Sequence, residues 1–209
     1  MSIDPEHVEQ FVRACRRIAS AGLVRCSSGN LSWRAGDGLM LISASRSWLA
    51  AMNEEFVTTC RIADGARVDG PRPSVETVFH AGILRERPEV AVVLHFQTPF
   101  ATTLACCRPA EVNYDVIPEI PVYIGPIGQV PYLPPGSPEL AEAVIAVMRS
   151  HNLAIMANHG QVVAGTSYDD AIEKAVFFEL ACEIIVRGGP DVRPLAGDET
   201  ERLRRIAKA

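Results

Sequence analysis

The spacing of apolar residues changes from segment to segment along the chain, and this change separates predicted helices from predicted strands. Apolar residues recur every three or four positions in four long segments, which predicts amphipathic helices. Each of these helices follows a residue that is typical of a helix N-cap, and the four caps are Asp4, Ser74, Ser137 and Ser167. A further helix is predicted over 100–107. Short apolar runs predict strands at 31–34, 39–42, 56–62, 120–124, 129–133 and 161–164, with two more that end at His95 and His159.

The order of these elements favours a mixed or antiparallel sheet flanked by helices, because many predicted strands follow one another through tight turns. A strict alternation of strands and helices is absent, as is the G-x-G-x-x-G motif, so a dinucleotide-binding fold is not expected. The helix after Ser74 is expected to bury four apolar side chains, those of Val75, Val78, Phe79 and Ile83. A chain of 209 residues fits one domain, which we place at 1–190, followed by a polar tail at 191–209 with room for a short helix.

Composition and charge exclude several classes of protein. Hydrophobic residues make up 48% of the chain and charged residues 22%, which is typical of a globular protein. The net charge of −5 and the lack of a long Lys/Arg block argue against a nucleic-acid partner. We expect no membrane contact, because no apolar run approaches the roughly 18 residues of a spanning helix, and no secretory signal, because the start is acidic. Six cysteines without C-x-x-C spacing indicate structural thiols in a reducing compartment, so we expect a cytoplasmic protein, with Cys26 as the one candidate for a reactive thiol.

Two histidines lie at the ends of apolar runs that are predicted to be buried strands. His95 ends one run, and His159 stands in the turn His159-Gly160 after another. Neutral imidazole is a common ligand of divalent metals such as zinc, and strand ends hold side chains rigidly. Glu76, near the start of a predicted helix, could act beside such an ion as a general base on a carbonyl compound. Each of these residues alone also fits an ordinary packing or helix-end role.

Three polar segments offer hydrogen-bond donors for an anion. They contain Gly29-Asn30, Ser45-Arg46 and Ser74. Hydroxyl groups, an amide, a guanidinium and the N–H groups of a helix N-terminus could hold a phosphate or a carboxylate. Each segment also fits a plain turn or a helix cap, so none is diagnostic alone.

The order of these motifs along the chain is more specific than any one of them. The blocks are Gly29-Asn30-Leu-Ser-Trp-Arg34, Leu41-Ile-Ser-Ala-Ser45, Pro73-Ser74-Val75-Glu76, Val93-Leu-His95-Phe-Gln97 and Asn158-His159-Gly160. In this order the chain resembles the class II aldolase/adducin family over roughly residues 5–188. The resemblance implies an α/β fold, a three-layer α/β/α sandwich around a largely antiparallel sheet. It also implies a homotetramer with active sites at the subunit interfaces.

The resemblance assigns roles to residues of this chain. Glu76 matches the family's catalytic acid/base, and His95 and His159 match two of its three histidine ligands to zinc. The third ligand position falls on Gln97. The family's anion-binding positions, which would hold the charged end of the substrate, fall on Gly29, Asn30, Ser45 and Ser74.

The chain departs from the family's pattern at three positions. Gln97 replaces a histidine, and its amide oxygen is a harder and weaker donor than imidazole, so we expect weaker zinc binding or acceptance of manganese or another divalent ion. Val75 replaces a second serine, and Arg46 stands where the family's sugar-phosphate aldolases have glycine. A guanidinium can bind a carboxylate through two hydrogen bonds, so a substrate with a carboxylate is a candidate beside a sugar phosphate. The family's tyrosine proton donor matches only Tyr114, and only if a gap is allowed.

The resemblance therefore implies a metal-dependent, aldolase-type lyase that acts on a small hydroxy-carbonyl substrate. A divalent ion, most simply zinc, would stabilise the enediolate that forms when a C–C bond breaks, and Glu76 would carry the proton. An epimerase, a decarboxylase or a dehydratase on the same scaffold is an alternative, because these reactions can share such an intermediate. The alternative from another class is a non-catalytic, adducin-like interaction domain. The presence of Glu76, His95 and His159 together favours an enzyme.

Overall fold

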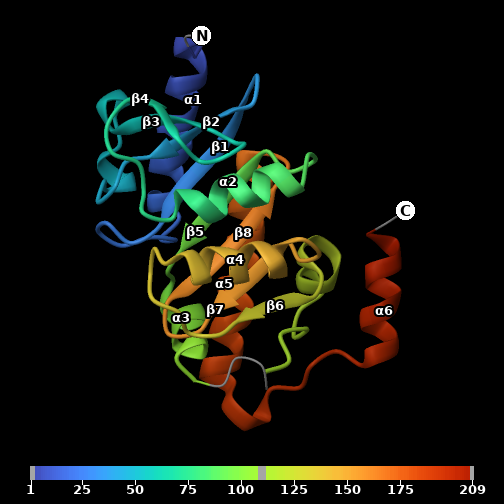
Figure 1. Ribbon diagram of the computed structural model, residues 1–209. Coiled ribbons are helices and arrows are strands. Elements are labelled where there is room, and N and C mark those ends of the chain that lie inside the picture. Colours follow the sequence, from blue (N-terminus) through green and yellow to red (C-terminus); the bar gives the residue numbers. More distant parts are fainter. Residues whose placement is uncertain (1–2, 108–111, 208–209) are drawn as a thin grey trace.

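The chain forms an eight-stranded sheet with helices on both faces (Figure 1). The computed structural model describes residues 3–107 and 112–207. The strands are β1 (Asn30–Gly36), β2 (Leu39–Ser43), β3 (Val57–Arg61), β4 (Arg67–Asp69), β5 (Val92–Phe96), β6 (Ile127–Val130), β7 (Leu153–Met156) and β8 (Gly160–Gly165). The α-helices are α1 (Pro5–Ser20), α2 (Thr77–Glu86), α3 (Pro99–Ala105), α4 (Pro138–Met148), α5 (Tyr168–Gly188) and α6 (Gly197–Ile206).

Almost all neighbouring strands run antiparallel. The order across the sheet is β4-β3-β2-β1-β5-β8-β7-β6, and among the described strands only β6 and β7 pair in parallel. Tight turns join β1 to β2 and β7 to β8, as the sequence predicts. The prediction of a largely antiparallel sheet flanked by helices is therefore confirmed.

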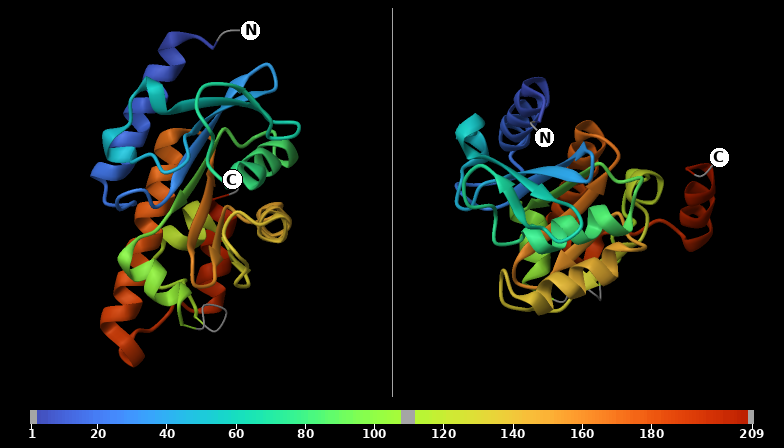
Figure 2. Two further views of the ribbon diagram at one scale, coloured as in Figure 1. Left: turned by 60° about the vertical axis from the view of Figure 1, so that its left-hand side comes forward. Right: turned by 45° about the horizontal axis from the view of Figure 1, so that its top comes forward.

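Alternate side chains of the strands enter two separate apolar cores, one on each face of the sheet. In β5, Val92, Leu94 and Phe96 pack with residues of α1, α3 and α5. Val93 packs in the opposite core with residues of α2 and α4. Figure 2 shows α1 and α5 on one side of the sheet and α2 and α4 on the other, which confirms the α/β/α layering. Because neighbours along a strand point to opposite faces, His95 lies on the face of Val93, where α2 begins.

The helix predicted after Ser74 begins later than expected. It starts at Thr77, and Glu76 occupies the N-cap position. Ser74 instead opens a turn, in which its carbonyl oxygen accepts from the Thr77 N–H (3.2 Å) and its hydroxyl oxygen accepts from the Glu76 N–H (3.2 Å). Two of the four apolar side chains predicted to be buried are therefore exposed: Val75 lies in the turn at 52% exposure, and Val78 faces outward at 55%. Phe79 and Ile83, the other two, are buried as predicted.

The strand predicted at 120–124 is wrong, because this segment is a π-helical turn, η4 (Ile120–Ile124). The alternation of apolar residues there resembles a strand, but Pro121 has no N–H to donate to a sheet. The Gly125 N–H closes the turn onto the Ile120 carbonyl at 2.8 Å. The short strand β4 was not predicted, since its three residues are all exposed and carry no apolar alternation.

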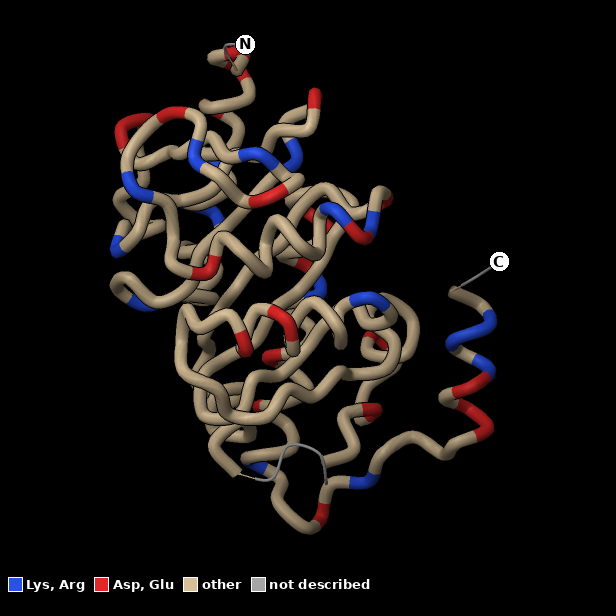
Figure 3. Tube along the Cα trace, in the orientation of Figure 1, with Lys and Arg blue, Asp and Glu red and all other residues tan. Residues whose placement is uncertain are grey.

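The last helix, α6, lies beside η4 and apart from both faces of the sheet (Figure 1). Asp115 holds it there, because the carboxylate pairs with Arg204 (Nη2–Oδ2, 3.0 Å) and the carbonyl oxygen accepts from the Leu195 N–H (2.8 Å). Charges of both signs follow one another along α6, as they do over much of the chain (Figure 3). The division into a domain at 1–190 and a tail at 191–209 stays a prediction. No helix in the described ranges is long and apolar enough to cross a bilayer.

Gly82→Ala tests the close packing of α2 on α4. A Cβ at Gly82 would lie 2.2 Å from Cδ1 and 2.6 Å from Cγ1 of Ile145. We expect the free energy of unfolding, measured in urea, to fall by about 1–3 kcal/mol, although alanine is the better helix former. Gly197→Ala in α6 is the control, because no heavy atom lies within 4 Å of its added Cβ, and it should not lower stability. Equal stability of Gly82→Ala and wild type would contradict this packing.

Candidate active site

One pocket of about 390 Å³ brings together all nine site residues predicted from the sequence. They come from the start of β1, the loop after β2, the turn before α2, the end of β5 and the β7–β8 turn, and they are Gly29, Asn30, Ser45, Arg46, Ser74, Glu76, His95, Gln97 and His159. The structure adds further lining residues, which are Ser27, Ser28, Ala44, Val75 and Pro135. Ala44 and Pro135 carry no chemical signal in the sequence, so only the fold could place them here.

Strand register brings the chemical groups of the pocket together. Asn30 of β1 is paired directly with His95 of β5, so both side chains leave the same face of the sheet. On its other side β5 pairs with β8, with Val162 opposite His95. The β7–β8 turn therefore delivers His159 beside His95, and the two ring centroids lie 4.9 Å apart.

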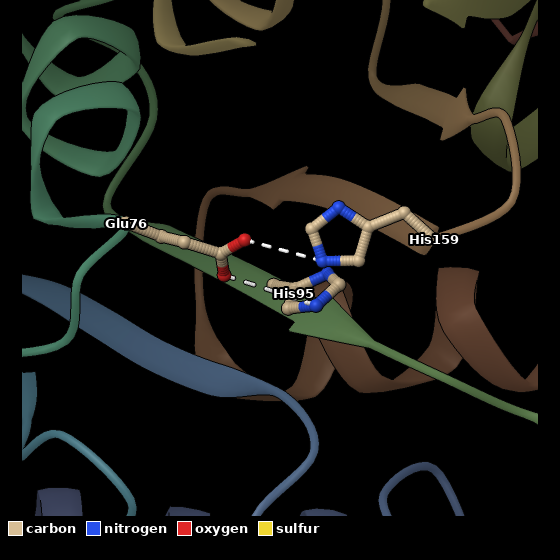
Figure 4. A group of neighbouring side chains, drawn as sticks. All are labelled: Glu76, His95 and His159. Carbon is tan, nitrogen blue, oxygen red and sulfur yellow. Dashed lines mark ion pairs between the residues drawn. The ribbon is translucent and has the colours of Figure 1, made fainter. Parts of the chain in front are cut away.

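The Glu76 carboxylate faces both imidazoles (Figure 4). Its Oε1 lies 3.3 Å from His159 Nε2, and its Oε2 lies 3.8 Å from His95 Nε2. Glu76 and His95 are buried, at 5% and 2% exposure, while His159 opens to the pocket. One ligand atom from each of these three residues lies within 4.8 Å of the others. This spacing suits a single cation held between them.

The two histidines are prepared to bind a metal through Nε2. His95 Nδ1 donates to the backbone carbonyl of Gln161 at 2.9 Å, which fixes its proton and leaves a lone pair on Nε2. His159 Nε2 points into the same space, whereas its Nδ1 is buried and has no hydrogen-bond partner among the described residues. Glu76 Oε1 is a second buried atom without a partner in the described part of the chain. Unpaired buried polar atoms around two imidazoles fit a site built for a divalent ion.

Gln97 uses its amide to hold the His159 turn. Its Nε2 donates to the His159 carbonyl oxygen at 2.6 Å. This bond fixes which way the amide faces, so the side-chain oxygen is the atom left for another partner. Gly160 leaves room for both side chains, because a Cβ there would lie 2.7 Å from Gln97 Cγ and 3.0 Å from His95 Cε1.

Asn30 bonds directly to the predicted catalytic carboxylate, which the sequence did not indicate. Its Nδ2 donates to Glu76 Oε2 at 2.7 Å, and its Oδ1 lies 2.5 Å from His80 Nε2. His80 Nδ1 in turn lies 2.7 Å from the Ser32 hydroxyl. The only signal in the sequence was the four-residue spacing from Glu76 to His80, which puts both on one side of a helix.

The buried carboxyl and imidazole groups all stay in their deprotonated forms at neutral pH. Burial raises the pKa of the Glu76 carboxyl, but His95, the Asn30 amide and His159 together outweigh burial and hold the pKa below its usual value. The carboxylate is therefore charged at neutral pH. Burial is the main cause that lowers the pKa of His159 to about 4 and that of His80 to about 3. A neutral imidazole at His159 is the form that can bind a metal.

The outer part of the pocket presents donors for an anion. The Ser74 hydroxyl accepts from the Glu76 N–H, so its own proton is available to a ligand. Arg46 is exposed and makes no hydrogen bond or ion pair among the described residues. Its backbone is left-handed (φ 63°), a conformation that favours glycine. Gly29 is also left-handed (φ 87°), and a Cβ there would meet the His95 carbonyl oxygen at 2.6 Å.

Tyr114, the sequence match for a proton donor, lies outside the pocket. It is 5% exposed and packs against Phe178 of α5, with ring centroids 5.3 Å apart. Burial raises the pKa of its hydroxyl above the usual range. No tyrosine in the described ranges lines the pocket.

Comparison with known proteins agrees with this geometry. The family model described as "Class II Aldolase and Adducin N-terminal domain" matches residues 9–186. A 3-oxo-tetronate 4-phosphate decarboxylase of Escherichia coli (strain K12) is 30% identical over 94% of this chain and 97% of its own length. A 5-methylthioribulose-1-phosphate/5-deoxyribulose-1-phosphate aldolase of Rhodospirillum rubrum is 34% identical over 92% of this chain and 87% of its own. The crystal structure of YgbL from Klebsiella pneumoniae superposes with a TM-score of 0.87 at 26% identity, covering 94% of this chain and 97% of that one.

Gly160→Ala tests the packing that holds His95 and Gln97. The added Cβ would lie 2.7 Å from Gln97 Cγ, 2.8 Å from the Phe96 carbonyl oxygen and 3.0 Å from His95 Cε1. The side chains of Gln97 and His95 would therefore have to shift. We expect the dissociation constant for Zn²⁺ or Mn²⁺, measured by calorimetry, to rise at least about tenfold. Gly165→Ala at the other end of β8 is the matched control, because it crowds Ala171 at 2.7 Å without touching the pocket. If Gly160→Ala keeps its metal affinity, or Gly165→Ala loses as much affinity, the packing at Gly160 does not position His95 and Gln97 for a metal.

Urea unfolding at several pH values tests the neutral state of His80. Its pKa is about 3 in the folded protein and near 6.5 when unfolded, so the unfolded chain binds the extra proton between these values. The free energy of unfolding of wild type minus that of His80→Gln should therefore fall as the pH drops from 6.5 to 4. The fall should be up to about 1.4 kcal/mol per pH unit. Metal-free protein is used throughout. A difference that stays level over this range would show that His80 is not kept neutral by the fold.

Proposed function

Because the chain belongs to the class II aldolase and adducin N-terminal domain family and is an enzyme of it, we propose that it is a metal-dependent lyase. Its reaction breaks or forms the C–C bond beside a carbonyl in a small hydroxy-carbonyl substrate with an anionic end. The observation that carries this proposal is the buried Glu76 carboxylate, which faces Nε2 of both His95 and His159 at 3.8 and 3.3 Å. A scaffold protein has no physical need to keep a charged carboxylate buried in this way.

Glu76 provides the acid and base for this reaction. As a carboxylate it accepts the proton of the substrate hydroxyl, and the C–C bond then breaks to leave an aldehyde and an enolate. The protonated Glu76 returns that proton to the enolate carbon, so no net proton is gained or lost. A divalent ion bound here would act as a Lewis acid on the substrate's carbonyl and hydroxyl oxygens.

The other pocket residues divide into two groups by their chemistry. His95 and His159 would hold the ion through Nε2, with the Gln97 amide oxygen as the third, weaker donor. Zinc is the expected metal, and the neutral oxygen donor favours tolerance of manganese or another divalent ion. The residues that would hold the anionic end of the substrate are Gly29, Asn30, Ser45, Arg46 and Ser74.

A second candidate reaction is the decarboxylation of a phosphorylated 3-oxo acid. Relatives with this activity in their names are 28–30% identical to the chain over 93–96% of its length. Arg46 supports it, since a guanidinium kept in a glycine-favouring backbone conformation has a reason to be there if it binds a carboxylate. The departing CO2 leaves the same kind of enolate, whose carbon must gain one proton. Glu76, a carboxylate before the reaction, would take this proton from water and pass it to the enolate carbon.

Assembly and compartment are expected from the same relationship. We propose a homotetramer whose subunit interfaces complete the pocket, because this chain supplies no tyrosine to it in the described ranges. The six cysteines are all free, which agrees with the proposed cytoplasmic location.

Glu76→Gln separates the acid/base role from metal binding. The substitution keeps the size of the side chain but removes its ability to take a proton. We expect kcat to fall at least about a hundredfold, while Zn²⁺ or Mn²⁺ still raises the melting temperature. His95→Ala should lose both activity and the metal-induced rise. Glu89→Gln, at an exposed ion pair with Arg87, is the control and should behave like wild type.

The substrate screen for this test covers ketose phosphates, phosphate-free ketoses and 3-oxo acids with and without phosphate, each with and without added metal. Aldehyde release identifies the aldolase and CO2 release the decarboxylase. If only substrates with a carboxylate react, Arg46→Gly should raise KM at least about tenfold. A protein that binds no divalent ion and turns over none of these compounds would disprove the proposed function.

A further inference from the structure

A line of hydrogen-bonded side chains leads from β1 through α2 to Glu76. Ser32 Oγ lies 2.7 Å from His80 Nδ1, and His80 Nε2 lies 2.5 Å from Asn30 Oδ1. Asn30 Nδ2 then lies 2.7 Å from Glu76 Oε2. Ser32 and His80 are fully buried, and neither lines the pocket. The hydrogen bonds of their side chains therefore reach the pocket through Asn30.

The direction of every bond in the line follows from the carboxylate at its end. An ionised carboxylate only accepts hydrogen bonds, so Asn30 presents its NH2 group to Glu76 and its carbonyl oxygen to His80. A carbonyl oxygen also only accepts, so His80 carries its proton on Nε2. A neutral imidazole then has a lone pair on Nδ1, and the Ser32 hydroxyl donates to it. Turning the Asn30 amide over would set its oxygen against the carboxylate.

Two rigid elements hold this line in place. His80 follows Glu76 by one helical turn, and its backbone N–H bonds to the Glu76 carbonyl oxygen at 3.4 Å. Ser32 follows Asn30 by two residues on β1, so both side chains lie on the same face of the sheet. The His80 ring also stacks on Phe79, with ring centroids 4.7 Å apart. The line therefore ties α2 to β1 directly beneath the pocket.

We propose that Ser32 and His80 are positioning residues, which orient the Glu76 carboxylate through Asn30 so that Oε1 is the oxygen that exchanges a proton with the substrate. Oε2 is occupied by the Asn30 amide. Oε1 is buried without a hydrogen-bond partner among the described residues and lies 3.3 Å from His159 Nε2, on the side where a metal and its substrate would bind. Asn30 keeps one N–H for the pocket, so it meets the substrate as a donor. The catalytic part of this inference rests on the proposed function, whereas the direction of the line does not.

Nitrogen-15 NMR of metal-free protein, labelled at histidine and asparagine, tests the direction of these hydrogen bonds without a substrate. We expect the His80 ring at pH 7 to be neutral with its proton on Nε2, and the Asn30 NH2 protons to exchange slowly with water. His80→Met removes the donor to Asn30 and Ser32→Ala the donor to His80, so each should speed that exchange at least about tenfold. A proton on His80 Nδ1 would reverse every bond in the line and overturn the proposal.

Kinetics with a substrate from the screen test whether the line positions Glu76 for catalysis. For His80→Met and Ser32→Ala we expect kcat to fall at least about tenfold, with KM and the dissociation constant of Zn²⁺ or Mn²⁺ each within about threefold of wild type. His80→Gln should recover most of kcat, because its Nε2 can still donate to Asn30. Thr58→Val is the matched control, since it removes another buried hydroxyl, one bonded to Pro71 O at 3.1 Å outside the pocket, and kcat should not change.

Different failures have different meanings in this design. If wild type turns over no substrate, the proposed function fails, while the His80 tautomer and the Asn30 exchange still decide the direction of the line. Two outcomes with an active wild type would show that the loss of kcat is merely structural and that the positioning role is wrong. In one, His80→Gln loses as much kcat as His80→Met. In the other, Thr58→Val loses as much kcat as Ser32→Ala.

Discussion

The antiparallel pairing of β1 with β5 is the constraint on which the site depends. It sets Asn30 opposite His95, so the amide that holds Glu76 and an imidazole that would hold the metal rise side by side from one face of the sheet. A slip of one residue in this register would turn one of the two side chains to the other face, into the core beneath α1, α3 and α5. The register is itself fixed by burial, because β5 has apolar partners on both faces. The packing of the sheet and the geometry of the pocket therefore have the same origin.

A charged carboxylate inside this packing needs compensation. Glu76 is 5% exposed, and one of its oxygens accepts a hydrogen bond from Asn30. The other oxygen lies 3.3 Å from His159 Nε2 and has no hydrogen-bond partner among the described residues. The neighbouring imidazole of His159 also keeps an unpaired buried nitrogen. Leaving such groups unpaired destabilises a fold, and protein sites accept that penalty where a ligand will complete them. The same atoms that weaken the isolated chain are those that a cation and its substrate would satisfy.

Membership in the family accounts for the α/β/α layers and for the group of Glu76, His95 and His159, but not for the choice of substrate. Gln97, Val75 and Arg46, the three positions at which the sequence is expected to depart from the family's pattern, all line the pocket. Gln97 fastens the His159 turn through its amide nitrogen, so a role for its oxygen at the metal is compatible with a structural role for its nitrogen. Arg46 stands at the exposed part of the pocket in a left-handed conformation. Under the proposed function, a change in these few side chains around Glu76 would direct the same enolate chemistry to a different substrate.

The sequence by itself determined the order of most elements and most of the helix caps, because these depend on local periodicity and on residue types. The resemblance to the family supplied nine of the residues that line the pocket. Asp4, Ser137 and Ser167 cap helices as predicted, since a cap is settled by atoms two or three residues away. The local pattern gave a wrong prediction at Ser74, because a turn closed by the Thr77 hydroxyl places the start of the helix at Thr77 and leaves Val75 exposed. It was also wrong at 120–124, because the alternation of apolar residues does not reveal that Pro121 lacks an N–H. Only the tertiary structure decided that Ser32, His80 and Asn30 join behind Glu76. Those contacts span 46 to 50 residues, and they exist because strand register and the docking of α2 place the side chains together, which no local pattern records.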